Sequence, residues 1–232
     1  MFLPTHPSSS FLARSSGSES ASFLTEPLMK MAQRRPDKPC LYQGQMTTVE
    51  KVWERVLRAS TWLQRNGVEP GSIVLMALSA DHPDAQVLAL AVTHAGATVS
   101  MLPTHLTQER FQRIVETSEP SCVFLDAGTA EFRGLVDSVL TVWMTSGLNQ
   151  GEWNEAELDE VFAERPAWGM PFAGKAESPA FLVYDNAGQD QGRVLTHRNL
   201  IEMMAGKHPH APQLAATLPG SQDDLHTDLL HF

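Results

Sequence analysis

The sequence predicts an α/β protein in which a largely parallel sheet is flanked by helices. Amphipathic helical segments alternate with short apolar runs from residue 23 onward, which is the order expected of βαβ units. The apolar run 73–78 is uninterrupted, and such a run is typical of a strand that is covered on both faces. Gly67 and Gly96 stand where helices should end. These three observations indicate parallel strands joined by helical crossovers.

The clearest helix is expected between Thr47 and Gly67. Thr47 and Glu50 have the spacing of a capping box, and Gly67 supplies a C-terminal stop. The apolar side chains of this segment recur at helical spacing and share one face: Val49, Val52, Trp53, Val56, Leu57 and Leu63.

The following elements repeat the same order along the chain. They are a helix capped within 81–84, a strand over 98–102, a helix capped by Thr107, strands over 122–125 and 139–143, and a strand over 180–184. Each apolar segment is bounded by turn residues or by a helix cap. The pattern therefore predicts a single repeated architecture without a sequence repeat of fixed period.

We divide the chain into four parts. Residues 1–22 are rich in serine and are expected to form a disordered tail, with a transit peptide as the alternative. Residues 23–145 form a first βα subdomain. Residues 146–178 form an acidic helix and linker, whose carboxylates are explained by a solvated helix face or by a site for a cation or basic partner. Residues 179–232 are expected to begin a second, incomplete sheet.

Composition excludes several classes of function. The chain has 232 residues, with 17 Lys and Arg against 27 Asp and Glu, a formal net charge of −10. An acidic protein of this kind is not expected to bind nucleic acid nonspecifically. No apolar run reaches the roughly 18 residues of a membrane span. Cys40 and Cys122 lack metal-type spacing and are expected to be free thiols in the reducing cytoplasm.

The most informative segment lies after the last expected strand. Residues 184–200 read YDNAGQDQGRVLTHRNL, so a strand enters a glycine-bearing loop and Thr196 then caps a helix. Strand, glycine-rich loop and helix are the parts of many phosphate-binding sites. The same pattern also fits an ordinary surface turn.

With this segment and three upstream motifs, the chain resembles the N-terminal part of the adenylate-forming enzymes. These are the acyl-CoA synthetases, the luciferases and the adenylation domains of peptide synthetases. Their phosphate loop reads Tyr-Thr-Ser-Gly-(Ser/Thr)-Thr-Gly-x-Pro-Lys-Gly-Val, followed by Thr-His-x-Asn-Leu. The upstream motifs lie at 63–74, 89–99 and 106–110, and the resemblance covers 23–205. It implies ATP and Mg²⁺ as cofactors and a reaction that converts a carboxylate to acyl-AMP and then to an acyl thioester.

The phosphate loop departs from this family pattern. Tyr184, Gly188, Gly192 and Arg193 are the candidate cofactor-binding residues, but the segment is two residues shorter than the family loop. Asp185 and Asp190 would repel phosphate, and Gln191 occupies the position of the loop lysine. Arg193 lies two positions later and is the one cation that could replace the lysine. We therefore expect the loop to be degenerate, with ATP and Mg²⁺ binding in doubt.

The length of the chain is the second departure, because family members are more than twice as long. Their later motifs bind adenine, ribose and Mg²⁺ and supply a catalytic lysine, so we assign no catalytic residue here. The resemblance thus predicts a truncated, catalytically inactive pseudoenzyme. The alternatives are a half-enzyme completed by a second chain, and a regulatory module that docks on a full-length adenylating enzyme or an acyl-carrier system.

Two further patterns are expected to carry no chemistry. Thr145-Ser146-Gly147 matches part of the phosphate signature, but the rest of the signature does not follow, so we expect a turn. Four histidines near the end of the chain have no accompanying cysteine or carboxylate pattern and predict no metal site: His208, His210, His226 and His231.

Overall fold

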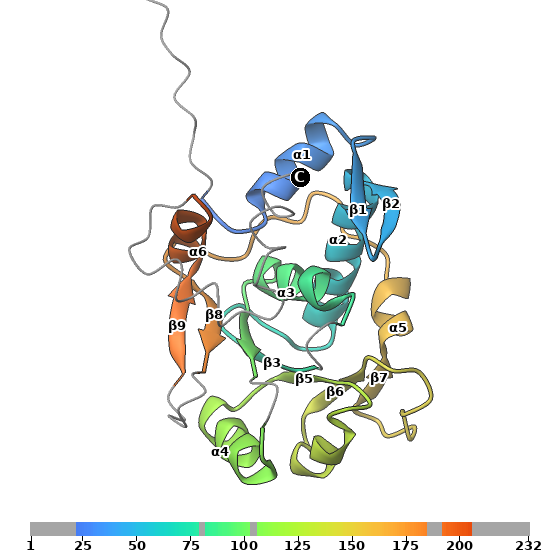
Figure 1. Ribbon diagram of the computed structural model, residues 1–232, viewed down its shortest axis with the longest axis vertical. Helices are drawn as coiled ribbons and strands as arrows, with labels where there is room; N and C mark the ends of the chain where they lie inside the picture. Colours follow the sequence, from blue (N-terminus) through green and yellow to red (C-terminus); the bar gives the residue numbers. More distant parts are fainter. Residues whose placement is uncertain (1–21, 79–81, 103–105, 185–191, 206–232) are drawn as a thin grey trace, which may run out of the picture.

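The computed structural model describes residues 22–78, 82–102, 106–184 and 192–205, and every structural statement below concerns these ranges. A seven-stranded sheet has the order β7-β6-β5-β3-β4-β8-β9, and a separate two-stranded sheet pairs β1 with β2 (Figure 1). The strands are β1 (Pro39–Tyr42), β2 (Gln45–Thr48), β3 (Ile73–Ala77), β4 (Thr98–Met101), β5 (Cys122–Leu125), β6 (Leu140–Trp143), β7 (Glu155–Glu157), β8 (Pro179–Val183) and β9 (Arg193–Thr196). The helices are α1 (Glu26–Arg34), α2 (Val49–Arg65), α3 (Ala85–His94), α4 (Gln108–Ser118), the 3₁₀ helix η1 (Ala130–Leu135), α5 (Leu158–Ala163) and α6 (His197–Met204).

The pairing of the large sheet confirms the predicted fold class. Strands β7, β6, β5, β3, β4 and β8 pair in parallel from one neighbour to the next, and β9 alone is antiparallel, to β8. Helices α2 and α3 lie on one side of the sheet, whereas α4 and η1 lie on the other (Figure 1). The alternation of apolar runs and amphipathic helices therefore gave the correct α/β architecture.

The start of α2 differs from the expected capping box. Thr48, not Thr47, is the N-cap residue, and its hydroxyl accepts a hydrogen bond from the Lys51 N–H at 3.4 Å. Thr47 belongs to β2, where it pairs with Cys40. Because the hairpin uses Thr47 as a strand residue, the helix begins one residue later and Glu50 no longer stands at the reciprocal position.

Of the predicted N-terminal caps of α3 and α4, the structure confirms only the second in full. Thr107 accepts from the Arg110 N–H at 3.3 Å, which confirms the predicted cap of α4. Asp84 occupies the N-cap position of α3 but makes no capping bond with its side chain. Its carboxylate instead accepts hydrogen bonds from Tyr42 and Arg55. A tertiary interaction has therefore replaced the local one at this helix start.

The acidic segment contains a strand that the sequence did not predict. Strand β7 pairs in parallel with β6, and Ala156 is buried between Glu155 and Glu157. Glu157 and Glu160 then form a capping box at the start of α5, so the expected acidic helix is present but short. A three-residue strand with one buried position has too little hydrophobic pattern to be recognised.

The segment from 179 does not begin a second sheet, contrary to the prediction. Strand β8 pairs in parallel with β4, so it extends the first sheet. The connector before β8 passes over the end of α3, where a Cβ at Gly96 would lie 2.6 Å from the Ala173 carbonyl oxygen. This close approach brings β8 beside β4. The expected disordered tail lies outside the described residues, except for Ser22 at its end.

The core consists of two large apolar clusters and one small one. The first lies between the sheet and α1, α2, α3 and α5, and the second lies between the sheet and α4 with η1. Phe111 and Phe132 stack in the second cluster with their ring centroids 4.4 Å apart. The small cluster joins β8, β9 and α6 through Ala180, Val183, Leu195, Leu200 and Met203. The β8–β9–α6 unit is therefore held by far fewer side chains than the centre of the sheet.

Candidate functional site

The candidate site is the β8–β9 hairpin at one side of the sheet. Strands β3, β4, β5 and β8 run in parallel, so their carboxyl ends share one edge. Open α/β sheets bind their ligands at this edge. Residues 185–191 connect β8 to β9 along the chain, and Gly188 is among these residues, which lie outside the described ranges. Tyr184, Gly192 and Arg193 are described and define the two ends of the hairpin connection.

Tyr184 is anchored in the protein core. Its side chain is only 3% exposed and belongs to the apolar cluster beneath α4, together with Leu125 and Phe111. Leu182 packs against the same cluster. A tyrosine held in this way fixes where the chain leaves β8, whereas a contact between Tyr184 and a cofactor stays a prediction.

Gly192 lies directly against the side chains of β8. A Cβ at this position would lie 2.6 Å from Leu182 Cδ1 and 3.1 Å from Tyr184 Cε1. A side chain at this position would have to displace Leu182, so glycine favours the close approach of the two chain segments. The structure therefore brings Tyr184 and Gly192 together and provides a packing reason for the glycine. A contact between Gly192 and phosphate stays a prediction.

Arg193 is the first residue of β9 and is exposed. It pairs with Val183 in the antiparallel ladder. Its position on the last strand of the sheet order leaves the guanidinium in contact with solvent. A charge in solvent attracts phosphate more weakly than one in a closed site, because water screens it.

The start of α6 is closed by bonds within the protein. The His197 N–H donates to Ser178 O at 3.3 Å, and the Arg198 N–H donates to Ala176 O at 2.9 Å. The Asn199 N–H donates to the Thr196 hydroxyl at 3.2 Å, and the Asn199 side-chain oxygen accepts from the Thr196 N–H. The first three N–H groups of the helix are therefore already used. Thr196 pairs with Pro179 at the start of β8, so this helix start lies at the end of the hairpin away from Tyr184 and Gly192.

A partly buried polar cluster that the sequence analysis missed joins four elements. Asp84, at the start of α3, accepts from Arg55 of α2 at 2.8 Å and from the Tyr42 hydroxyl of β1. The Arg55 guanidinium also lies 3.7 Å from the ring centre of Phe162 in α5. Burial, and then the Asp84 carboxylate, raises the pKa of Tyr42 above its usual value. These partners are far apart in the sequence, so no local spacing could have revealed them.

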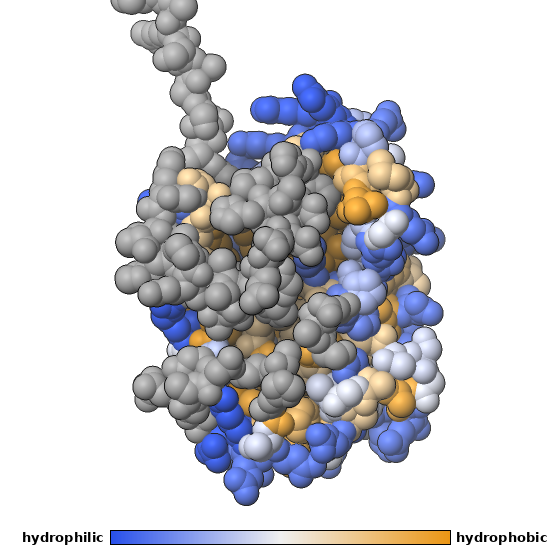
Figure 2. Space-filling view, in the orientation of Figure 1, coloured by the Kyte–Doolittle hydropathy of each residue, from blue (hydrophilic) through white to orange (hydrophobic). Residues whose placement is uncertain are grey.

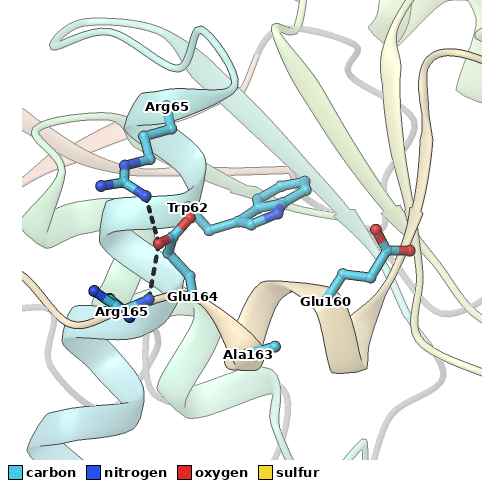
Figure 3. Close-up of a pocket in the computed structure, with 6 residues that line it drawn as sticks. All are labelled: Trp62, Arg65, Glu160, Ala163, Glu164 and Arg165. Carbon is cyan, nitrogen blue, oxygen red and sulfur yellow. Dashed lines mark hydrogen bonds and ion pairs between the residues drawn. The ribbon is translucent and has the colours of Figure 1, made fainter.

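The pocket between α2 and α5 has a volume of about 610 Å³ (Figure 3). Glu164 lines it and accepts hydrogen bonds from Arg65 Nη1 at 2.6 Å and from the Arg165 N–H at 2.8 Å. Its carboxylate is thus engaged by two donors of the pocket itself. The pocket lies on the side of the molecule opposite the hairpin (Figure 1), so it does not extend the candidate site.

Other sequence candidates have structural roles or fall outside the description. Gly147 lies in a turn with a φ of +83°, and the Thr145 hydroxyl accepts from the Ala127 N–H at 3.2 Å, which confirms the predicted turn. Over the described ranges, no group of three or more potential ligands could hold a metal ion. The four histidines near the end of the chain lie beyond residue 205 and are not described.

The fold and the hairpin define a class of protein: an open α/β sheet with a glycine-bearing connection at the carboxyl edge of its parallel strands. Comparison with known proteins identifies the class more closely. The chain belongs to the AMP-binding enzyme family, whose pattern matches residues 28–226. This establishes the family resemblance drawn from the sequence motifs.

The relatives agree with this assignment. Tenellin synthetase from Beauveria bassiana (strain ARSEF 2860) is 25% identical over 179 residues, which is 76% of this chain and 4% of that protein. The benzoate CoA ligase of Burkholderia xenovorans LB400 has a TM-score of 0.65 at 20% identity, over 79% of this chain and 36% of that one. The luciferase-like enzyme of the mealworm Zophobas morio has a TM-score of 0.66 at 14% identity, over 80% of this chain and 45% of that one. This chain thus spans less than half the length of each of these three proteins.

Proposed function

We propose that this chain is a non-catalytic member of the AMP-binding family, which keeps the fold of an adenylate-forming ligase but does not form acyl-adenylates by itself. The observation that carries this proposal is the position of Arg193. It is the cation closest in the sequence to the lysine position of the family pattern, and it lies exposed at the start of β9. Water screens a charge in this position, so it would hold phosphate only weakly.

The charges of the connecting segment support the same conclusion. Asp185 and Asp190 place two carboxylates between β8 and β9 in the sequence, and Gln191 replaces a lysine of the family pattern. Phosphate sites combine N–H donors with a cation, whereas carboxylates repel the phosphate oxygens. Arg193 is exposed at the start of β9 and would have to offset both carboxylates. ATP and Mg²⁺, which the family implies, do not fit such a donor set, so we derive no reaction step through them.

The packing of the hairpin supports retention of the fold without the chemistry. Tyr184 is buried, and Gly192 lies against Leu182 and Tyr184. These contacts stabilise the hairpin whether or not a ligand binds. The loop can thus lose its ligand-binding residues while the protein still folds, because different side chains serve the two purposes.

Carboxylate-dependent exchange between ATP and pyrophosphate tests the proposal. We expect the purified chain to show no exchange above background with a panel of aliphatic and aromatic acids, while an active acyl-CoA ligase assayed alongside does exchange. Exchange by the purified chain would contradict the proposal. If that exchange then disappeared in Arg193→Ala, Arg193 would be identified as the cation that replaces the family lysine.

A second candidate function is docking on a full-length adenylating enzyme or an acyl-carrier system. The observation that favours it is the exposed end of the sheet: β9 is the last strand in the order, and Val194 is 50% exposed there. An edge strand can add a strand from another chain. Light scattering and co-purification test this alternative, and a strictly monomeric protein without partners would argue against it.

The cellular setting is also a proposal. Both cysteines are free, as expected, and Cys122 is fully buried. Free thiols fit the cytoplasm, where disulfides are rare. Of the helices in the described ranges, none has the length and apolar character needed to cross a membrane.

A further inference from the structure

Two chain segments cross over the junction between α3 and α6. The first consists of residues 22–25, which we call the strap, and the second is the loop 170–173. Phe23 of the strap stacks on Phe172 of the loop, with ring centroids 4.4 Å apart. The Ala173 N–H approaches His94 O at 3.5 Å. The strap and the loop therefore lie against each other and against the end of α3.

Two fully buried histidines lie beneath these segments. His94, the last residue of α3, contacts Met170 O through Nε2 at 3.3 Å and the Thr25 hydroxyl through Nδ1 at 3.0 Å. A carbonyl oxygen can only accept, so the His94 proton resides on Nε2 and Nδ1 accepts from Thr25. His197, the first residue of α6, accepts the Leu24 N–H through Nδ1 at 3.2 Å. The His197 imidazole must therefore be unprotonated at Nδ1 to accept from the Leu24 N–H.

The surroundings of the pair are apolar. The Trp53 ring packs edge-on against His94 at 5.0 Å, and the Phe172 ring packs edge-on against His197 at 4.6 Å. The pKa of each histidine is lowered to about 4, by burial in both cases and, for His197, also by the charge of the neighbouring His94. No carboxylate within the described ranges has a hydrogen bond or ion pair with either ring that would stabilise a positive charge.

The charged groups on the surrounding elements are engaged elsewhere or exposed. Glu26 of α1 pairs with Lys30 at 2.6 Å, and Arg55 of α2 pairs with Asp84 at the far end of α3. Glu177, in the loop before β8, pairs with Arg198 of α6. Lys175 before β8 and Arg193 on β9 are exposed cations, and Glu202 on α6 is partly exposed. Glu26 and Glu177 thus pair with cations and not with either histidine.

We propose that His197 and His94 form an acid-sensitive latch, in which protonation of His197 at Nδ1 releases the strap. The Leu24 N–H donates to Nδ1, and a protonated Nδ1 would present a second donor to this amide. The hydrogen bond is then lost, the proton comes from solvent, and no covalent bond changes. At His94 the Thr25 hydroxyl can reverse its role and accept, so His197 is the decisive position.

Release of the strap would open the junction between the two parts of the core. Leu24 packs against both the large cluster beneath α2 and α3 and the small cluster of β8, β9 and α6. An apolar cavity of about 400 Å³, lined by Phe23, Met29 and Phe172, lies beside it. The latch therefore controls how firmly the hairpin unit is held to the rest of the chain. It does not depend on ATP binding or on the proposed function.

Hydrogen exchange of the Leu24 amide, measured by NMR at pH 7 and pH 5, tests the latch. The amide's protection factor is corrected for the intrinsic exchange rate at each pH. A pKa that changes from 6.5 in the open form to about 4 in the closed form lowers the protection factor by at least about 20-fold between these pH values. A protection factor that is the same at both pH values would overturn the proposal.

The variant His197→Asn separates the latch from general acid sensitivity. The Asn Oδ1 can occupy the place of Nδ1 and accept from Leu24, but it does not titrate in this range. We expect the ratio of the Leu24 protection factor at pH 7 to that at pH 5 to be about 20-fold smaller in His197→Asn than in the wild type. The control His82→Asn, which lies outside the strap, should keep the wild-type ratio. An unchanged decrease in His197→Asn would contradict the latch.

If His197→Asn does not fold, the NMR titration of the His197 ring in the wild-type chain decides. The proposal requires the neutral tautomer with its proton on Nε2 and no protonation above pH 5 while the strap is closed. Titration of this ring near pH 6.5 in the folded protein, or a proton on Nδ1, would overturn the proposal.

Discussion

The centre of the sheet and the β8–β9–α6 unit are built by the same rules but differ in how much holds them. In the centre, Leu75 and Phe124 on neighbouring strands are fully buried between two layers of helices. The β8–β9–α6 unit relies on a small cluster, one close glycine contact at Gly192 and the strap at Leu24. Apolar residues also show between the hydrophilic ones on the face seen in Figure 2. The difference teaches that the central packing can hold the fold with little contribution from the hairpin.

The largest expected effect is in the centre of the sheet. Phe124→Ala on β5 removes a fully buried ring, and we expect it to lower the free energy of unfolding by about 3–5 kcal/mol. The control Leu41→Ala changes a side chain that is 58% exposed on β1 and should alter the same quantity by less than about 0.5 kcal/mol. Urea unfolding followed by circular dichroism measures both. Similar effects for the two variants would refute the comparison.

The second largest expected effect is the loss of stability on acidification, which acts through the two buried histidines at the junction of α3 and α6. The folded pKa values of His94 and His197, about 4, lie below the unfolded value of 6.5. The unfolded chain therefore binds more protons, so stability is full above about pH 6.5 and falls as the pH is lowered toward 4. By pH 4.5 each histidine lowers the free energy of unfolding by roughly 2 kcal/mol.

Unfolding in urea at pH 7, 5.5 and 4.5 measures this loss, and the variant His197→Asn shows its source. The variant should lose less stability between pH 7 and 4.5 than the wild type. An equal loss in both proteins would assign the acid sensitivity to other groups.

The close contact at the hairpin gives the third prediction. Gly192→Ala places a Cβ 2.6 Å from Leu182 Cδ1, and we expect the repacking to lower the free energy of unfolding by about 1–3 kcal/mol. Gly134→Ala is the matched control, because nothing lies within 4 Å of its added Cβ and its φ is not positive. Thermal unfolding of the two variants should show a lower midpoint for Gly192→Ala alone. Equal midpoints would show that Leu182 moves aside without cost.

The smallest predicted effect is at the start of α6. Thr196→Ala removes the hydroxyl that caps the Asn199 N–H and should cost about 1 kcal/mol. Thr107→Ala at α4 removes a similar cap and serves as the reference. We expect Thr196→Ala to cost at least as much, because Thr196 and Asn199 bond reciprocally. Chemical denaturation measures both variants. A much smaller loss of unfolding free energy for Thr196→Ala would mean that the capping box of Thr196 and Asn199 contributes little to the stability of the β8–β9–α6 unit.

Local patterns predicted most of the sheet but not its long-range contacts. Apolar runs identified β3, β4, β5 and β6 because each strand is buried on both faces. The pairing of β8 with β4 escaped prediction, since partners 82 residues apart, such as Val99 and Phe181, leave no local signal.

The site was predicted unevenly for the same reason. The resemblance to the family loop pointed to Tyr184, and the structure shows that its side chain is buried; a role in ligand binding stays a prediction. The bonds that close the start of α6 were not predicted, because Ser178 and Ala176 lie on the connector and not in the loop motif. His94 and His197 were likewise ordinary in sequence, and only the fold brings the strap over them.

Titration of Mg·ATP into the folded chain by isothermal calorimetry tests the central claim most directly. Circular dichroism first establishes that the sample is folded. We predict no binding heat at millimolar ATP, because two carboxylates precede Arg193, Gln191 occupies the lysine position of the family pattern, and Arg193 is exposed. Binding with micromolar affinity, equivalent to about −8 kcal/mol, would contradict the account and show that the altered hairpin still holds phosphate.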